Sequence, residues 1–216
     1  MTQKDASVYA GQSKQERQQV RHQQLIQAGI DAFGLDGYHA CTVREICKRA
    51  ELSHRYFYES FEDMEGLFLA VYSHCVTDME QRLIETFHSS SGESSIEKII
   101  EKLLFEFYSM VEDERIVRIC CIDILGVGSA ADALYSEKVA SFANLLRVFL
   151  SMLFPTFKTD PDILDVLAIS VVGSVEQSAI FWYLNKYSTP KEKMVLAQSL
   201  IVSGVLTSLK NHSTQP

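Results

Sequence analysis

Five side chains between residues 53 and 58 carry groups that commonly bind nucleic acid. They are a hydroxyl, an imidazole, a guanidinium and two phenols, at Ser53, His54, Arg55, Tyr56 and Tyr58. Arginine can donate two hydrogen bonds to a guanine edge, whereas hydroxyl groups often bind phosphate. By position, Arg55 is the best candidate for a guanine edge, Tyr56 for a base or a thymine methyl group, and Tyr58 for phosphate. We therefore predict that this group contacts DNA.

Two short helices joined by a tight turn are expected to carry these side chains. Thr42 is a good N-cap, and Glu45 three residues later completes a capping box. A turn follows, and Ser53 caps the second helix. Phe57 and Phe61 give this helix its buried side, so its other side chains face solvent. The pattern is typical of a helix-turn-helix, whose second helix enters the major groove.

The first helix of this pair would add contacts to the DNA backbone. Its N-terminal residues Thr42, Val43 and Arg44 are expected at phosphates, because the N-terminus of a helix attracts anions. Arg17 and Arg21, which precede the pair, could reach phosphate or the minor groove. They could equally be ordinary solvated charges, so both interpretations stay open.

Charge is distributed unevenly along the 216 residues, which carry a net charge of −8. Residues 1–60 hold 8 Lys and Arg against 7 Asp and Glu, whereas the remainder holds 12 against 21. Phosphate would repel the acidic part of the chain. The DNA-binding surface is therefore expected within the N-terminal quarter.

Helical patterns extend over the whole chain. A capping box at Ser13 and Glu16 begins a helix that runs to about Phe33, and no segment alternates with a period of two. Further helices are expected at about 63–87, 95–112, 115–125, 131–153, 161–187 and 190–210. We predict an all-α protein of about nine helices. A three-helix DNA-binding domain would span 13–62 and a larger helical ligand-binding and dimerisation domain 63–210, with 63–87 as the connecting helix.

The last two predicted helices are apolar on nearly every side, so each needs burial on every side. A second copy of the chain is the simplest cover, and we expect a homodimer. The longest apolar stretch, residues 194–209, is short for a membrane span. The polar N-terminus shows no signal peptide. We therefore expect a cytoplasmic protein that does not bind membranes.

Large aromatic side chains recur in the C-terminal part of the chain. Each ring alone is more simply a core residue, but as a group they could line an apolar to amphipathic ligand pocket. Glu176 is one candidate polar anchor for such a ligand. The predicted ligand-binding set is Phe105, Tyr108, Asp123, Phe142, Phe149, Gln177 and Phe181.

No catalytic or metal motif accompanies these patterns. The adjacent pairs Cys120–Cys121 and His74–Cys75 point about 100° apart on a helix, so neither forms a ready chelate. Five cysteines imply no disulfide framework. The sequence has no Ser/His/Asp order, phosphate loop or metalloprotease motif. We expect no cofactor, no metal and no enzymatic activity.

The N-terminal residues also follow the pattern of a known family. The first helix reads Leu25-Ile26-Gln27-Ala28-Gly29-Ile30-Asp31-Ala32-Phe33, then Gly37-Tyr38. The match continues at Thr42, Val43, Ile46, Ala50, Leu52 and Ser53, and closes at Tyr58, Phe61, Leu67, Ala70 and Val71. In this order and spacing the chain, from about residue 17 to 75, resembles the tetracycline-repressor (TetR) family of bacterial transcriptional regulators.

Five departures from the family pattern fall within the same segment. Cys47 replaces a small alanine, and Glu51 replaces the turn glycine. Arg55 and Tyr56 stand where many members have smaller residues. Met64 stands where a lysine commonly touches phosphate. DNA binding would therefore depend more on the second helix than in most members.

The resemblance implies a homodimeric repressor that binds a palindromic operator in double-stranded DNA. Members commonly hold an inducer between their middle helices, so a small apolar or amphipathic ligand would release the operator. Two alternatives stay open. One is a constitutive or architectural DNA-binding dimer without ligand control. The other, which no motif supports, is a small-molecule carrier or an enzyme.

Overall fold

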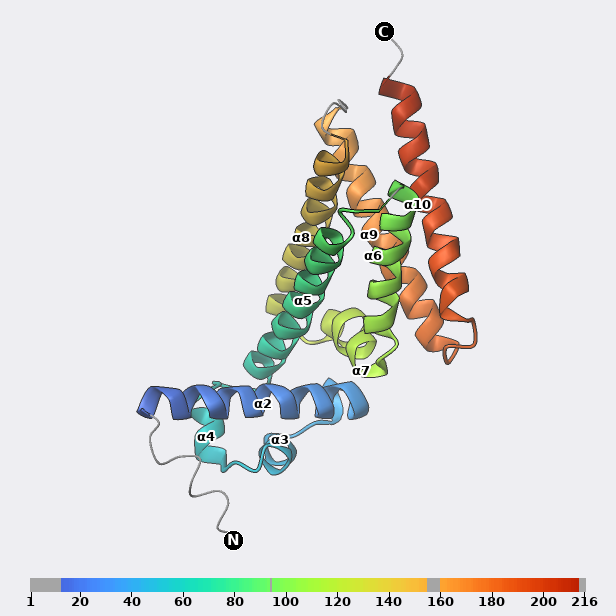
Figure 1. Ribbon diagram of the computed structural model, residues 1–216. Helices are drawn as coiled ribbons and strands as arrows, with labels where there is room; N and C mark the ends of the chain where they lie inside the picture. Colours follow the sequence, from blue (N-terminus) through green and yellow to red (C-terminus); the bar gives the residue numbers. More distant parts are fainter. Residues whose placement is uncertain (1–12, 94, 155–159, 214–216) are drawn as a thin grey trace.

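The computed structural model describes residues 13–93, 95–154 and 160–213. Its secondary structure is 84% helix, and the described residues include no strand (Figure 1). The predicted all-α class and the predicted number of helices are confirmed. Residues 94 and 155–159, which fall within the predicted C-terminal domain, lie outside the described part. The α-helices are α2 (Lys14–Asp36), α3 (Val43–Arg49), α4 (His54–Tyr58), α5 (Met64–Ser89), α6 (Ile96–Val111), α7 (Glu114–Val117), α8 (Ser129–Leu153), α9 (Pro161–Leu184) and α10 (Lys191–Ser213).

Three helices form the N-terminal helix-turn-helix domain, at the bottom of Figure 1. Helix α2 begins at the predicted capping box, in which the Glu16 amide donates to Ser13 Oγ and the Ser13 amide donates to Glu16 Oε2. The helix ends at Gly37, whose φ of 88° favours glycine. Its buried residues, among them Leu25 and Phe33, form the base on which the short helices α3 and α4 are held.

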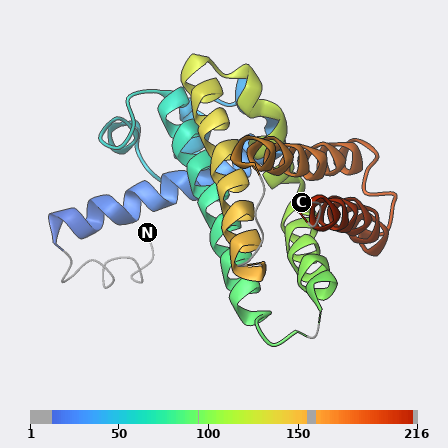
Figure 2. The same ribbon diagram turned by 90° about the horizontal axis from the view of Figure 1, so that it is seen from above.

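The longer helices form the C-terminal domain above α2. Helix α5 rises from the N-terminal domain beside α8, whereas α9 and α10 lie together at one side of the molecule (Figure 2). One continuous apolar core runs from α2 through α5 to α10. A smaller cluster at the far end of α5 centres on Phe87 and Phe149, whose rings stack with centroids 4.1 Å apart.

The predicted helix at 115–125 is broken into three pieces. The short helix α7 is followed by one turn of π-helix, η2 (Arg118–Ile122), and then by a 3-10 turn, η3 (Asp123–Gly126). Arg118 and Asp123, at the two ends of the π turn, contact the last turn of α2 and the segment that follows it, respectively. The Arg118 guanidinium donates to the Leu35 carbonyl at 2.7 Å, and the Tyr38 amide donates to Asp123 Oδ2 at 2.9 Å.

Helices α9 and α10 expose much of their apolar surface. By length and composition alone, α9 and the part of α10 up to Leu209 could each cross a membrane, although the apolar stretch at 194–209 is short for a span. Only 11% of the most apolar stretch of α9 is buried in the single chain. Its exposed stripe follows helical spacing through Ile163, Val166, Ser170, Gly173, Gln177, Phe181 and Leu184.

Candidate functional site

The predicted helix-turn-helix geometry is present at α3 and α4. Thr42 caps α3 by accepting from the Glu45 amide at 3.3 Å, and its own amide donates to Glu45 at 3.2 Å. Ser53 lies in the extended conformation before α4, although its side chain makes no capping hydrogen bond. Ile46 and Phe57 are fully buried and hold the two helices against α2. The pair is therefore built as the sequence predicts.

The turn between the two helices places Glu51 in the left-handed region, with φ of 55°. The Leu52 amide then donates to the Cys47 carbonyl at 2.9 Å, which closes the turn. A residue other than glycine in this conformation carries a cost of about 1–2 kcal/mol. The chain therefore keeps the turn geometry that glycine would give, at the expense of local strain.

Most of the predicted DNA-contacting side chains are on the molecular surface. Six are exposed, and Val43 and Tyr56 are half-buried because they pack against the core and against α2, respectively. Tyr58 is 61% exposed, which fits a group free to bind phosphate. The exposed six are Thr42, Arg44, Ser53, His54, Arg55 and Tyr58. Their role in binding DNA stays a prediction.

An acidic residue that sequence reasoning missed, Glu59, connects the basic groups of this surface. Arg55 Nε donates to Glu59 Oε1 at 2.8 Å, and Arg21 Nη2 lies 3.7 Å from Glu59 Oε2. The Arg21 guanidinium also lies 4.3 Å from the centre of the Tyr56 ring. The spacing of four residues between Arg55 and Glu59 could have indicated this pair. Arg21 thus belongs to the surface around α4. This position favours a contact with DNA over the interpretation as an ordinary solvated charge.

The C-terminal domain contains an apolar cavity of about 190 Å³ between α5, α6, η2, α8 and α9. Its walls carry five aromatic rings, at Tyr72, Phe107, Tyr135, Phe142 and Phe149. Aliphatic side chains and the thiols of Cys120 and Cys121 complete the walls. Such a cavity, with few polar groups, is typical of a site for a small apolar molecule.

Glu176 is the acidic group of the cavity wall. The Tyr135 hydroxyl donates to both of its carboxylate oxygens, at 3.1 and 3.0 Å. Burial raises the pKa of Glu176, and the hydrogen bond from Tyr135 partly opposes this effect. Lys138 also lines the cavity, but its ammonium lies 3.7 Å from the exposed carboxylate of Glu137. The Lys138 side chain is only 18% exposed, so the cavity wall carries one cationic and one acidic side chain.

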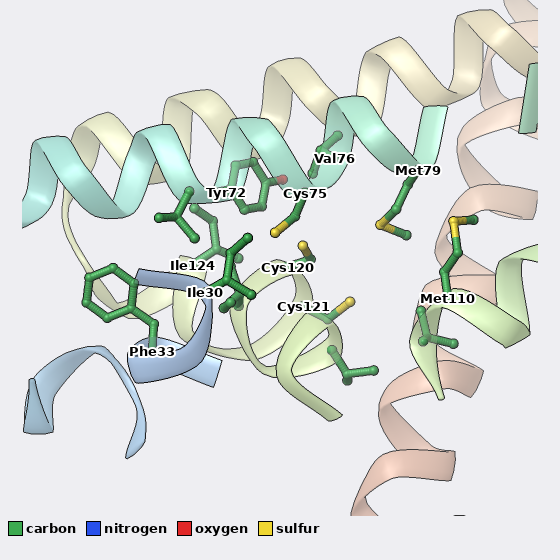
Figure 3. Close-up of a cluster of buried hydrophobic side chains, with 14 of the residues drawn as sticks. Ile30, Phe33, Tyr72, Cys75, Val76, Met79, Met110, Cys120, Cys121 and Ile124 are labelled. Carbon is green, nitrogen blue, oxygen red and sulfur yellow. The ribbon is translucent and has the colours of Figure 1, made fainter. Parts of the chain in front are cut away.

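The thiols beside the cavity are held in their protonated form. Figure 3 shows Cys75 of α5 and Cys120 of η2 pointing toward each other. A hydrogen bond with Cys75, together with burial, raises the pKa of Cys120 well above its usual range. Burial also raises the pKa of Cys121. In the part of the chain that the structure describes, no group of three or more His, Cys, Asp or Glu side chains could hold a metal.

Only two of the seven predicted ligand residues, Phe142 and Phe149, line this cavity. Phe105 is 45% exposed on the outer face of α6, where the Lys191 ammonium lies 4.7 Å from its ring centre. Tyr108 is fully buried behind the wall, with its hydroxyl 2.6 Å from Ser178 Oγ. Neither residue lines this cavity, and their role in binding a ligand stays a prediction.

The other three predicted ligand residues also lie elsewhere. Asp123 binds the Tyr38 amide at the contact with the N-terminal domain. Gln177 and Phe181 are on the exposed stripe of α9, and the neighbouring Glu176 faces inward instead. Hydropathy could not distinguish these faces, because α9 is apolar on both. The rings of Tyr72, Phe107 and Tyr135, on α5, α6 and α8, were also missed.

A second set of contacts joins the cavity wall to the DNA-binding domain. Arg115 Nη1 donates to Asp31 Oδ1 of α2 at 2.5 Å, and its Nη2 donates to Asp113 at 2.6 Å. Gly34 of α2 packs so closely here that an added Cβ would lie 2.3 Å from Arg115 Cβ. The segment from residue 115 to residue 123 therefore contacts α2 on one side and lines the cavity, through Cys120 and Cys121, on the other.

A helix-turn-helix domain joined to a helical domain with an apolar cavity is the architecture of a transcription-regulator fold. Residues 25–71 match the family model of bacterial regulatory proteins, tetR family. The match identifies the N-terminal domain as a tetR-family DNA-binding domain.

Solved structures with a similar fold include regulators of this kind. A tetR-family transcriptional regulator from Streptomyces coelicolor has a TM-score of 0.73 at 17% identity, covering 89% of this chain and 82% of that one. FadR from Bacillus subtilis, in complex with stearoyl-CoA, has a TM-score of 0.69 at 14% identity, covering 83% and 96%. A transcriptional regulator from Aquifex aeolicus has a TM-score of 0.61 at 21% identity, covering 86% and 99%. These low identities show a common fold alone. No curated protein matches the sequence.

Proposed function

We propose that the protein is a homodimeric repressor that a small apolar ligand releases from a palindromic DNA operator. The observation that carries this proposal is the position of the segment from residue 115 to residue 123. It lines the cavity through two thiols and bonds to α2, the base of the DNA-binding domain. A ligand that displaces this wall would therefore shift α2 and the helices packed on it.

The switch needs a ligand that binds the DNA-incompetent conformation better than the competent one. A coupling of about 1–3 kcal/mol is typical of such regulators. Helix α5 offers a second connection between the cavity and the DNA-binding domain. It forms another wall of the cavity and begins directly after the helix-turn-helix. In this proposal residues 13–62 form the DNA-binding unit and residues 63–210 the unit that senses the ligand and dimerises.

The exposed stripe of α9 and its counterpart on α10 support dimerisation. Val166, Leu184, Leu196 and Leu200 are each more than half exposed in the single chain. Small residues at the middle of the α9 stripe, such as Gly173, would allow two helices to cross closely. A second copy of the chain accounts for this surface, since the two helices of each protomer would form a four-helix interface. The paired recognition helices would then reach successive major grooves about 34–36 Å apart.

Selection of bound sequences from random duplex DNA tests the DNA-binding part of the proposal. We expect an inverted repeat whose half-sites are separated by about 10–10.5 base pairs, with binding that weakens as salt increases. Arg55→Ala should lower affinity by about 1–3 kcal/mol per half-site and relax the sequence preference. Arg82→Ala is the matched control, because Arg82 pairs with Glu106 between α5 and α6. Enrichment of no sequence, or equal effects of the two variants, would refute this part.

Oligomeric state tests the dimer. Val166→Asp and Leu200→Asp should each produce a monomer in light scattering, with a large loss of operator affinity. A wild-type protein that is monomeric, or that partitions into a membrane fraction, would contradict the four-helix interface. A dimeric protein whose operator affinity no cavity ligand changes would instead be a constitutive DNA-binding dimer.

A further inference from the structure

The cavity combines an apolar wall with one inward-facing acid. Glu176 is the carboxylate among its lining residues, and Tyr135 is its hydrogen-bond donor from α8. A carboxylate offers about four acceptor positions, whereas a tyrosine hydroxyl has a single proton to donate. Glu176 can therefore accept further hydrogen bonds from a molecule in the cavity.

The charges around the cavity favour a cation over an anion. The Lys138 ammonium lies 3.7 Å from Glu137, which partly offsets its charge, whereas Glu176 has no ion-pair partner among the described residues. Residues 61–216, which build the cavity, hold 12 Lys and Arg against 21 Asp and Glu. The field of this acidic domain would attract positive ligands and repel negative ones.

The aromatic walls of the cavity also favour a positively charged ligand. Tyr72, Phe107, Tyr135, Phe142 and Phe149 present rings to the cavity. The face of an aromatic ring attracts an ammonium group, and this attraction is strongest where water is excluded. Tyr135, which contacts Glu176 directly, and the other rings of the cavity therefore favour an organic cation over a neutral hydrocarbon.

The volume limits the size of the ligand. An apolar cavity of about 150 Å³ holds a benzene molecule. The cavity described above measures about 190 Å³, which leaves room for one ring with a short side arm.

We propose that the ligand is an organic ammonium ion with an apolar body of about one ring, whose ammonium group binds Glu176 while the body packs against the aromatic walls. The proposal rests on the ligand site of the proposed function and specifies the chemical class of its occupant. The bound ammonium would offset the burial that raises the pKa of Glu176. Tyr135 then positions the carboxylate for the ammonium.

Three probes of matched size and different head group test this proposal on the wild-type protein. They are 2-phenylethylamine, 2-phenylethanol and 3-phenylpropanoate, and calorimetry measures the affinity of each for the full chain. We expect the amine to bind about tenfold or more tightly than the carboxylate, since a hydrogen bond between charged groups is worth more than a neutral one. Equal binding of the two, or tighter binding of the carboxylate, would overturn the proposal.

A substitution of Glu176 tests whether this residue binds the ammonium group of the ligand. Glu176→Gln keeps the shape of the side chain and should weaken the amine about tenfold while changing 2-phenylethanol affinity less than about twofold. Glu85→Gln makes the same change in net charge at an exposed position of α5 outside the cavity and should leave both affinities unchanged. Unchanged amine binding by Glu176→Gln would place the cation elsewhere. If this variant fails to fold, the comparison of head groups on the wild-type protein still decides the proposal.

Operator release separates the ligand class from the proposed function. Amine binding without any change in operator affinity would leave this proposal standing and refute ligand control by this class. Operator release by the carboxylate and not by the amine would refute the ammonium ligand and support ligand control of the operator. Release by the amine, lost in Glu176→Gln but retained in Glu85→Gln, would support both proposals.

Discussion

Glu59 is expected to restrain the basic groups of the recognition surface. It pairs with Arg55 at 2.8 Å and lies 3.7 Å from Arg21, so one carboxylate partly neutralises two guanidinium groups beside α4. Glu59→Gln removes the charge but retains the size of the side chain and the ability to accept a hydrogen bond. We predict that this variant binds random-sequence DNA more tightly than the wild type and discriminates its operator less well.

The magnitude follows from the exposure of the groups. The Arg55 side chain is 83% exposed and that of Glu59 36%, so the ion pair itself contributes only about 0–1 kcal/mol. Loss of repulsion between the carboxylate and phosphate is of similar size, about 1 kcal/mol for each protomer. Two protomers would gain about 2 kcal/mol, an increase of roughly thirtyfold in affinity for random DNA. If each freed arginine gains one phosphate, the slope of log affinity against log salt steepens by about 0.9 per contact.

Fluorescence anisotropy with a random duplex and with the selected operator, each at several salt concentrations, measures these quantities. Glu85→Gln is the matched control, because Glu85 accepts from Gln81 on α5 and its loss changes the net charge equally. The ratio of operator to random affinity should fall in Glu59→Gln and stay constant in the control. Weaker binding to both duplexes with an unchanged salt slope would refute the reasoning and show that Glu59 itself contacts DNA or supports the fold.

Three further predictions concern the cavity, its contact with α2 and the exposed stripe. Gly34→Ala should lower the free energy of unfolding by about 1–3 kcal/mol in denaturant titration, because the added Cβ would lie 2.3 Å from Arg115 Cβ; unchanged stability would contradict this close packing. Burial raises the pKa of Glu176 in the folded state, so its contribution to stability is present at low pH and is lost as pH rises through the folded-state pKa. Relative to the wild type, Glu176→Gln should therefore gain Tm as pH rises, and a constant difference would argue against a buried carboxylate. Gly173→Ala meets no atom within 4 Å in the single chain but should weaken the dimer in analytical ultracentrifugation if α9 crosses its copy there.

The helix-turn-helix could be predicted because its signals are local. A capping box involves residues three positions apart, and both predicted boxes, at Ser13 and at Thr42, are present. Phe57 determines the buried side of α4, because its ring carries no polar group and is buried away from water. The family match over residues 25–71 covers this same region, where spacing and order determine the fold.

The cavity could not be predicted residue by residue, because its helices are apolar on more than one face. On α9 the adjacent residues Glu176 and Gln177 point to opposite environments, one into the cavity and the other to the exposed stripe. The prediction named Glu176 as one possible anchor but assigned Gln177 to the ligand. Only the packing of α9 against α8 determines which of the two faces inward.

Asp123 was predicted to bind a ligand, but its observed contact bears on the proposed link between the cavity and the DNA-binding domain. As a polar residue among apolar ones it seemed suited to anchor a ligand, but it instead binds the Tyr38 amide, 85 positions away in the chain. A contact of this sequence separation has no local signal. It places the end of the π-helical turn against the DNA-binding domain, and the thiols of the same turn line the cavity. In the proposed switch, the residues that line the cavity and those that contact the DNA-binding domain are therefore neighbours in one short segment, so a shift of this segment would link the two domains.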